Sequence, residues 1–175
     1  NRLKDAGCDT IYLSSVETEP CLYKYIDYLC FYLISRGFKI GIRTNGLCDN
    51  FLNIIPLLDA EISISINSLD PKINKLICGN EDVPNMENIF NTLHKNNKKC
   101  RISIVVNHYN VDDAMYTIDF LQIFDCISYI QLRKRYEYTN NNNMSYDDDC
   151  MAFNQVKRLL DMKYKDTPKT NFHES

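Results

Sequence analysis

"EISISINSLDPKINKLICG", residues 61–79, contains the unit that decides the fold. Its first six residues place isoleucine at every second position, a pattern typical of a short strand. Asp70 and Pro71 follow, and this pair suits the N-cap and the first position of a helix. The stretch therefore predicts a strand over 61–66 that leads directly into a helix.

The same strand-then-helix order recurs along all 175 residues. Short apolar runs predict strands over 9–14, 38–42, 61–66, 100–106 and 127–133. Helical patterns follow them over 21–37, 50–60, from 70 onward and through 85–97, 110–124 and 147–164. This alternation predicts a parallel α/β fold, either a barrel, a partial barrel or a doubly wound sheet. In all three, ligands bind at the carboxyl ends of the strands.

Composition limits the classes of function. Apolar residues make up 45% of the chain and charged residues 25%, which is typical of one globular domain with a real core. The net charge of −3 argues against a general nucleic-acid binder or a binder of anionic membranes. No apolar run reaches membrane-spanning length, so we expect no membrane partner.

Eight cysteines are spread along the chain, and none forms a Cys-x-x-Cys pair. Most fall in apolar segments, where a free cysteine behaves as a small hydrophobic residue. This distribution disfavours a zinc ribbon or a redox motif and predicts reduced structural cysteines in a cytoplasmic protein.

Polar residues gather just after each predicted strand, where a ligand is expected. The segments are "SSVETEP" (14–20), "RTNG" (43–46), "NSLD" (67–70), "NHYN" (107–110) and "RKRYEY" (133–138). Most carry Asn, Thr or Ser, which suits a polar and largely uncharged ligand face. Each also has a purely structural interpretation, such as a turn at 44–46 or a helix start at 67–71.

Local sequence context makes Glu19 and Asn107 better ligand candidates than their polar neighbours. Pro20 restricts Glu19 to extended geometry, which aims the Glu19 carboxylate across the mouth of the sheet. Glu17 is interpreted as a solvated loop acid. Asn110 stands at capping-box spacing from Asp113 and is interpreted as a helix cap, which leaves Asn107 as the better ligand candidate.

Taken in order, these motifs resemble the radical S-adenosylmethionine (radical SAM) superfamily. "ETEP" (17–20) stands where that family usually has Gly-Gly-Glu-Pro, and "RTNG" looks like its Thr-Asn-Gly. The segments 62–79 and 101–121 resemble the family's fourth and fifth strands, and the similarity covers roughly residues 1–135.

The resemblance implies a partial (β/α)6 barrel of TIM type, with five of its six parallel strands present as strands two to six. It also implies a division of the chain into the barrel (1–138), a polar loop (139–146) and a C-terminal helix and tail (147–175).

The resemblance also implies roles for individual residues. Glu19 would accept a hydrogen bond from the methionine amino group of S-adenosylmethionine. The remaining cofactor-binding candidates flank that group or face the ribose, the methionine carboxylate or the adenine: Thr18, Thr44, Asn45, Ser65, Asn67, Asn107, the backbone near Leu132, and Arg133.

Two departures from the family pattern bear on activity. Glu17 and Thr18 replace the two glycines, and no Cys-x3-Cys-x2-Cys holds a [4Fe–4S] cluster. "NRLKDAG" (1–7) is typical of a helix end, so we expect the cluster ligands upstream of residue 1. We therefore expect no radical chemistry from residues 1–175 alone. The family's chemistry would also need an electron donor such as flavodoxin or ferredoxin, and the small-molecule or peptide substrate stays unassigned.

Two other functions remain open. A degenerate, cluster-free half-barrel would serve as a binding or assembly module, and the glycine replacements favour it slightly. A different parallel α/β enzyme with a phosphate-bearing ligand is disfavoured, because the chain has five glycines and no Gly-rich phosphate loop.

If the first barrel strand lies upstream, this chain by itself exposes a sheet edge, and exposed edges pair with other chains. We expect the 175-residue chain to self-associate in light scattering unless that strand is supplied. A well-behaved monomer would count against a missing strand.

Overall fold

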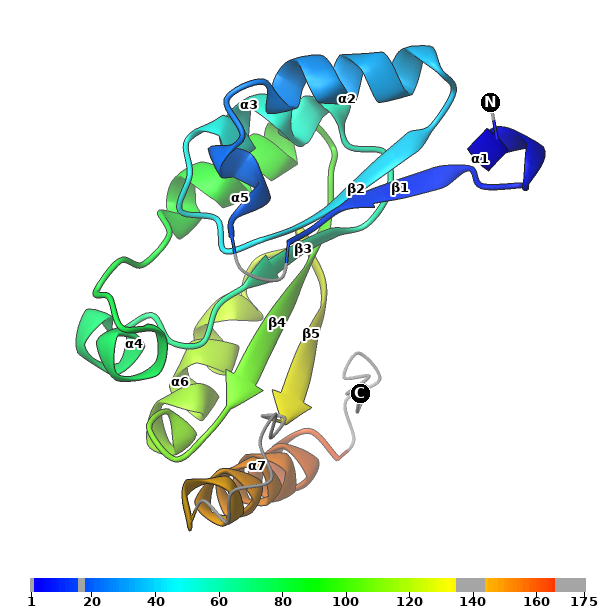
Figure 1. The fold of residues 1–175 in the computed structure, drawn as a ribbon. Coiled ribbons are helices and arrows are strands. Elements are labelled where there is room, and N and C mark those ends of the chain that lie inside the picture. The colour runs from blue at the N-terminus through cyan, green and yellow to red at the C-terminus, as the bar shows by residue number, and fades with distance from the viewer. Residues whose placement is uncertain (1, 16–17, 135–143, 166–175) are drawn as a thin grey trace. The chain divides into compact units, whose positions relative to one another are not determined.

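A computed structural model describes residues 2–15, 18–134 and 144–165 (Figure 1). Helices and strands alternate along the chain as predicted. In chain order they are α1 (Arg2–Asp5), β1 (Thr10–Leu13), η1 (Pro20–Leu22), α2 (Ile26–Ser35), β2 (Lys39–Thr44), α3 (Asn50–Ile54), η2 (Ile55–Leu57), β3 (Ile62–Ser65), α4 (Pro71–Cys78), α5 (Met86–Lys95), β4 (Cys100–Val106), α6 (Val111–Leu121), β5 (Ile127–Lys134) and α7 (Met144–Lys163).

The strands form one five-stranded sheet in the order β1-β2-β3-β4-β5. β1 pairs with β2 in parallel, Tyr12 opposite Gly41, and β2 pairs with β3 in parallel, Ile42 opposite Ile62. The predicted parallel α/β fold is therefore confirmed, and all five predicted strands exist with ends shifted by two residues at most.

The chain divides into two compact units. The first unit comprises residues 1–65 and 84–101, and the second comprises 66–83 and 102–175. Each unit is described by itself below.

The first unit buries one face of its strands under helices. Figure 1 shows α2, α3 and α5 gathered beside β1, β2 and β3. Buried apolar residues occupy alternate positions of β2 and β3 and so lie on one face of the sheet. They include Ile40, Ile42, Ile62 and Ile64, each at most 1% exposed. Burial of this face fixes the register of the strands and so fixes where each strand ends.

The helix predicted over 21–37 is shorter than expected. Pro20–Leu22 forms a 3-10 turn, and the α-helix begins only at Ile26. Leu22 lies within the predicted helix but is 68% exposed, whereas Ile26 and Cys30 are buried. The reason is local: the Glu19 carboxylate accepts the Cys21 N–H, which favours a tight turn at Pro20.

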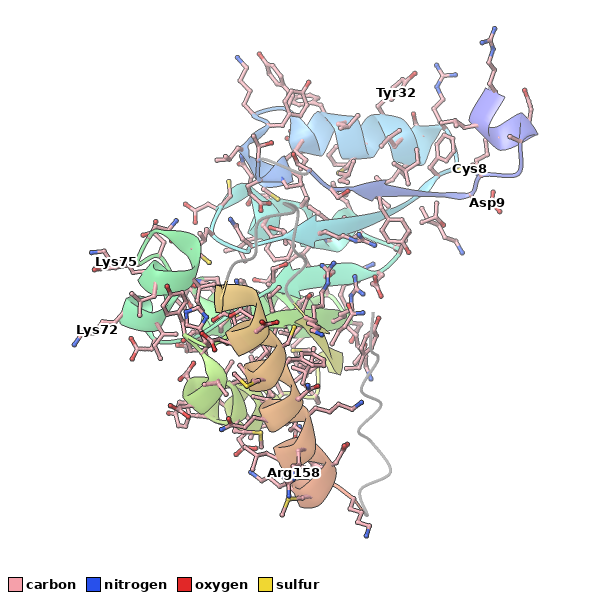
Figure 2. All side chains as sticks on the ribbon, turned by 60° about the horizontal axis from the view of Figure 1, so that its bottom comes forward. Cys8, Asp9, Tyr32, Lys72, Lys75 and Arg158 are labelled. Carbon is pink, nitrogen blue, oxygen red and sulfur yellow. The ribbon has the colours of Figure 1, made fainter. Side chains whose placement is uncertain are left out.

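The outward side of α2 is unusually aromatic. Tyr32 points away from the sheet in Figure 2 and is 56% exposed. Other large side chains on and just before this helix are also exposed: Tyr23, Tyr25, Tyr28 and Phe31. Tyr25 stacks edge-on against both Tyr23 and Tyr28.

The helical region predicted from residue 70 to 97 is two helices. Gly79 has a φ of 79° and ends α4, since this left-handed conformation suits glycine. Asn85 then caps α5 by accepting the Asn88 N–H. The predicted start at Asp70 is confirmed: its carboxylate accepts the Lys72 N–H at 2.7 Å. Lys72 and Lys75 of α4 point outward in Figure 2.

The second unit places α6 and α7 beside β4 and β5 (Figure 1). Ile102, Ile104 and Val106 of β4 are fully buried, as are Ile118 of α6 and Val156 of α7. The final helix begins at Met144, three residues before the predicted 147. Residues 139–143 of the predicted polar loop lie outside the described residues.

The capping box predicted at 110–113 is wrong. Asn110 occupies the N-cap position of α6 but makes no side-chain capping bond. Asp113 instead accepts hydrogen bonds from Ser68 Oγ at 2.7 Å and Thr117 Oγ1 at 3.0 Å. The buried Ser68 hydroxyl needs a partner, and Asp113 supplies it.

No helix among the described residues is long and apolar enough to cross a membrane.

Gly41 allows a close approach that other residues would block. A Cβ there would meet the Tyr12 ring at 2.5 Å and the Glu61 carbonyl oxygen at 2.8 Å. We expect Gly41→Ala to lower the free energy of unfolding by about 1–3 kcal/mol in urea denaturation. Adding Tyr12→Ala removes the ring contact but not the carbonyl contact. Full recovery in the double variant would contradict this explanation.

Candidate functional site

Glu19 is the centre of a hydrogen-bond cluster in the first unit. Its backbone is extended, with φ −86° and ψ 125°, as the following proline requires. Oε1 accepts from Thr44 Oγ1 at 2.6 Å and from Cys21 N at 3.2 Å. Oε2 accepts from Asn45 N at 2.8 Å. The carboxylate thus links the segment after β1 to the end of β2.

The Glu19 carboxylate retains acceptor capacity. An ionised carboxylate has about four lone-pair positions, and the three bonds above leave one on Oε2. Glu19 as a whole is only partly buried. A negative group with one vacant acceptor position and a fixed orientation suits an ammonium donor.

The turn at 44–46 holds the two donors in place. Thr44 is 3% exposed and also accepts the Gly46 N–H, while Asn45 Oδ1 accepts the Leu47 N–H. Gly46 has a φ of 75°, which a glycine adopts without strain. The turn interpretation of "TNG" is therefore correct, and the turn also aims Thr44 Oγ1 and the Asn45 backbone N–H at Glu19.

Cys21 lies beside this cluster as a neutral thiol. Burial raises the pKa of Cys21 well above its usual range, and the nearby Glu19 charge raises it further. The Cys21 carbonyl accepts from Cys48 Sγ and Asn50 Nδ2, both at 3.0 Å. Because the thiol stays protonated, it adds no second negative charge next to Glu19.

Two other candidates of the first unit are exposed. Thr18 Oγ1 lies 2.9 Å from Ser15 Oγ, on the segment leading to Glu19. Ser65 ends β3 with its side chain exposed to solvent. Glu17, interpreted as a solvated acid, lies outside the described residues.

In the second unit, Asn67, Asn107 and Asn110 form a network of side-chain and backbone bonds. Asn67 Oδ1 accepts the Val105 N–H at 3.1 Å, continuing the ladder of β4 beyond the end of β3. Asn107 Oδ1 accepts the N–H groups of Tyr109 and Asn110. Both predicted ligand residues therefore have structural partners of their own.

Asn110 has a larger structural role than the sequence indicated. It is completely buried, and its Nδ2 donates to the carbonyl oxygens of Asn67 at 2.8 Å and Val105 at 3.0 Å. Its Oδ1 accepts the Asn107 N–H at 2.8 Å. Asn110 thus joins the ends of two chain segments that are far apart in sequence.

The last two candidates lie on β5. Leu132 is 4% exposed, and the neighbouring Arg133 is exposed. This alternation follows from the strand, whose successive side chains point to opposite faces.

Sequence reasoning missed His108 and Asp149. They are 41 residues apart and form a close pair in the second unit, His108 Nδ1 lying 2.6 Å from Asp149 Oδ1. No spacing rule relates the end of a strand to the first turns of a helix after the next strand, so no sequence signal was available.

The residues present fit one of the two expected cofactors. The vacant acceptor on Glu19 fits the amino group of S-adenosylmethionine. A [4Fe–4S] cluster does not fit: among the described residues no group of three or more His, Cys, Asp or Glu side chains is arranged to hold a metal ion. None of the eight cysteines forms a disulfide, and half of them are buried.

Comparisons with known proteins agree with the fold. The sequence model of the radical SAM superfamily matches residues 1–121. A curated relative is the S-adenosyl-L-methionine-dependent tRNA 4-demethylwyosine synthase of Methanocaldococcus jannaschii, 23% identical over 151 residues, which are 85% of this chain and 47% of that protein. The chain therefore spans about half the length of this relative.

Solved structures of similar fold include Streptococcus suis SuiB bound to S-adenosylmethionine. It has a TM-score of 0.70 and 20% identity, over 99% of this chain and 39% of that one. A domain of the pyruvate-formate lyase-activating enzyme of Bacteroides vulgatus has a TM-score of 0.55 and 14% identity, over 84% of this chain and 94% of that one.

The buried network predicts a stability effect. Asn110→Ala removes three hydrogen bonds at a buried site and leaves their backbone partners without these bonds. We therefore expect the free energy of unfolding to fall by about 1–3 kcal/mol. Asn91→Ala, on the exposed side of α5, is the matched control and should change it by less than about 0.5 kcal/mol. Equal effects of the two variants in thermal or urea denaturation would contradict the network.

Proposed function

Because the chain belongs to the radical SAM superfamily, we propose that it is the S-adenosylmethionine-binding core of a radical SAM enzyme. The observation that carries this proposal is the Glu19 cluster. A carboxylate held by Thr44 Oγ1 and the Asn45 N–H retains one vacant acceptor position in a partly exposed site.

Glu19 would bind the ammonium of the methionine end. Hydrogen bonds between ionised groups are about twice as strong as neutral ones. The donors from Thr44 and Asn45 orient the carboxylate before the ligand arrives, so little rotamer entropy is lost on binding. Thr18 lies beside Glu19 and would border the same group.

The other candidates take lesser parts in this proposal. Ser65 offers an exposed hydroxyl at the end of β3. In the second unit, Asn67 would face the ribose or the methionine carboxylate, and Asn107 would approach the ribose or the adenine. The backbone near Leu132 would meet the adenine edge, and Arg133 would contribute an exposed cation.

S-adenosylmethionine bound here, together with a reduced cluster, would supply the radical chemistry by which hydrogen is abstracted from a substrate. The role of this chain's residues is to bind and orient the molecule that supplies it. The proposal includes a [4Fe–4S] cluster whose ligands come from outside residues 1–175. It also includes an electron donor such as flavodoxin or ferredoxin.

A second candidate function is a cluster-free binding or assembly module. Glu17 and Thr18 in place of two glycines favour it, because glycine would let a ligand approach the backbone more closely. Anaerobic reconstitution of the protein carrying this chain separates the two. Formation of 5′-deoxyadenosine supports the enzyme, and its absence from a protein that still binds S-adenosylmethionine supports the module.

We expect Glu19→Gln to weaken S-adenosylmethionine binding about tenfold or more, since a hydrogen bond to a charged group contributes about 1.5–3 kcal/mol. Isothermal titration of the protein carrying this chain measures the affinity. Glu87→Gln is the matched control, because Glu87 is an exposed acid in the first turn of α5. An unchanged affinity of Glu19→Gln for S-adenosylmethionine would contradict the proposed role of Glu19 in binding its amino group.

A further inference from the structure

His108 and Asp149 form an oriented pair that the proposed cofactor site does not use. His108 follows β4 directly, and Asp149 lies in α7. The imidazole Nδ1 lies 2.6 Å from Asp149 Oδ1, and the His108 backbone N–H donates to the same oxygen at 2.9 Å. The Asp149 side chain is 0% exposed, whereas the His108 side chain is 30% exposed.

The buried carboxylate fixes the state of the imidazole. A carboxylate without water is costly unless it receives hydrogen bonds, so Asp149 requires donors such as His108 Nδ1–H. In the neutral imidazole one nitrogen is a donor and the other an acceptor. With the proton on Nδ1, Nε2 keeps its lone pair, and the described residues offer this atom no hydrogen-bond partner.

The backbone on both sides of His108 is held rigidly. Asn107 accepts the N–H groups of Tyr109 and Asn110, and Asn110 is itself completely buried. The Tyr109 ring lies 3.9 Å from the imidazole, centroid to centroid, at 44°. His108 is therefore fixed by Asp149 on one side and flanked by an aromatic ring.

We propose that His108 is a proton-transfer residue of the reaction and that Asp149 is its positioning residue. His108 stands at the carboxyl end of a strand, the edge at which parallel α/β proteins bind their reactants. The substrate would carry an N–H or O–H group at the reacting centre. This inference rests on the proposed function, because it assumes that the chain is part of an enzyme.

The proton-transfer step needs no reactant besides His108 and the substrate. The substrate N–H or O–H bond breaks as an Nε2–H bond forms, and the electron pair of the broken bond stays on the substrate. The positive charge that develops on the imidazolium faces the Asp149 carboxylate. The reverse step returns the proton. General acid–base catalysis of this kind contributes about 10²–10⁴-fold to a rate.

A purely structural role for the His108–Asp149 pair explains less of its geometry. It accounts for the buried Asp149 carboxylate and for its bond to the His108 backbone. It does not require an imidazole, nor a side chain that is 30% exposed.

Ethoxyformylation by diethyl pyrocarbonate tests the pair, since this reagent reacts with an accessible, unprotonated imidazole nitrogen. The chain has three histidines, so peptide mass spectrometry resolves each one. We expect His108 to react faster than the exposed His94 of α5, although His108 is less exposed. Asp149→Asn should slow His108 about tenfold or more and leave His94 unchanged.

Nitrogen-15 NMR of the histidines gives an independent signature. We expect the Nδ1–H tautomer for neutral His108 and its loss in Asp149→Asn. If Asp149→Asn fails to fold, the wild-type protein alone decides. An Nε2–H tautomer, or a His108 slower than His94 toward the reagent, overturns the proposal.

Titration with S-adenosylmethionine separates this inference from the proposed function. The ethoxyformylation rates and the tautomer of His108 are measured without S-adenosylmethionine, so they test the pair alone. Failure of the wild-type protein to bind S-adenosylmethionine would instead count against the proposed function alone.

Discussion

The first unit depends on one electrostatic constraint, the need of the Glu19 carboxylate for hydrogen-bond donors. Pro20 fixes the backbone that presents this carboxylate, and the turn after β2 supplies Thr44 Oγ1 and the Asn45 N–H. The parallel register of β1 against β2, with Ile11 opposite Ile40 and Leu13 opposite Ile42, brings the two strand ends to the same edge. The same bonds that satisfy the carboxylate leave it one acceptor position short of saturation.

Much of this arrangement could be predicted from the sequence, because it rests on local signals. Short apolar runs predicted the strands, among them β3 with its alternating isoleucines, and Asp70-Pro71 predicted the start of α4. The extended backbone of Glu19 followed from Pro20. One local prediction failed because of a competing hydrogen bond. The Glu19 carboxylate accepts the Cys21 N–H, and Pro20–Leu22 forms a 3-10 turn where helical spacing predicted a regular helix.

Long-range pairs could not be predicted, because nothing in the sequence relates their members. Asn110 has the right residue type and spacing for a cap, yet its amide is buried and bonds to the backbone of Asn67 and Val105. His108 and Asp149 come from separate segments that only tertiary packing brings together. In each case a buried polar group takes whichever partner the fold provides, and this outcome overrides local preference.

The two units therefore use polar residues in different ways. In the first unit, a partly exposed carboxylate keeps bonding capacity for a ligand. In the second unit, the amides of Asn67, Asn107 and Asn110 accept or donate bonds to backbone groups, so their main effect is to hold the strand ends still. Rigid strand ends are what a nearby reactive group requires, because the orientation of His108 is only as well defined as the backbone on either side of it. Asn110, whose side-chain bonds all go to backbone groups, would in this way help to fix the position of the proposed proton-transfer residue.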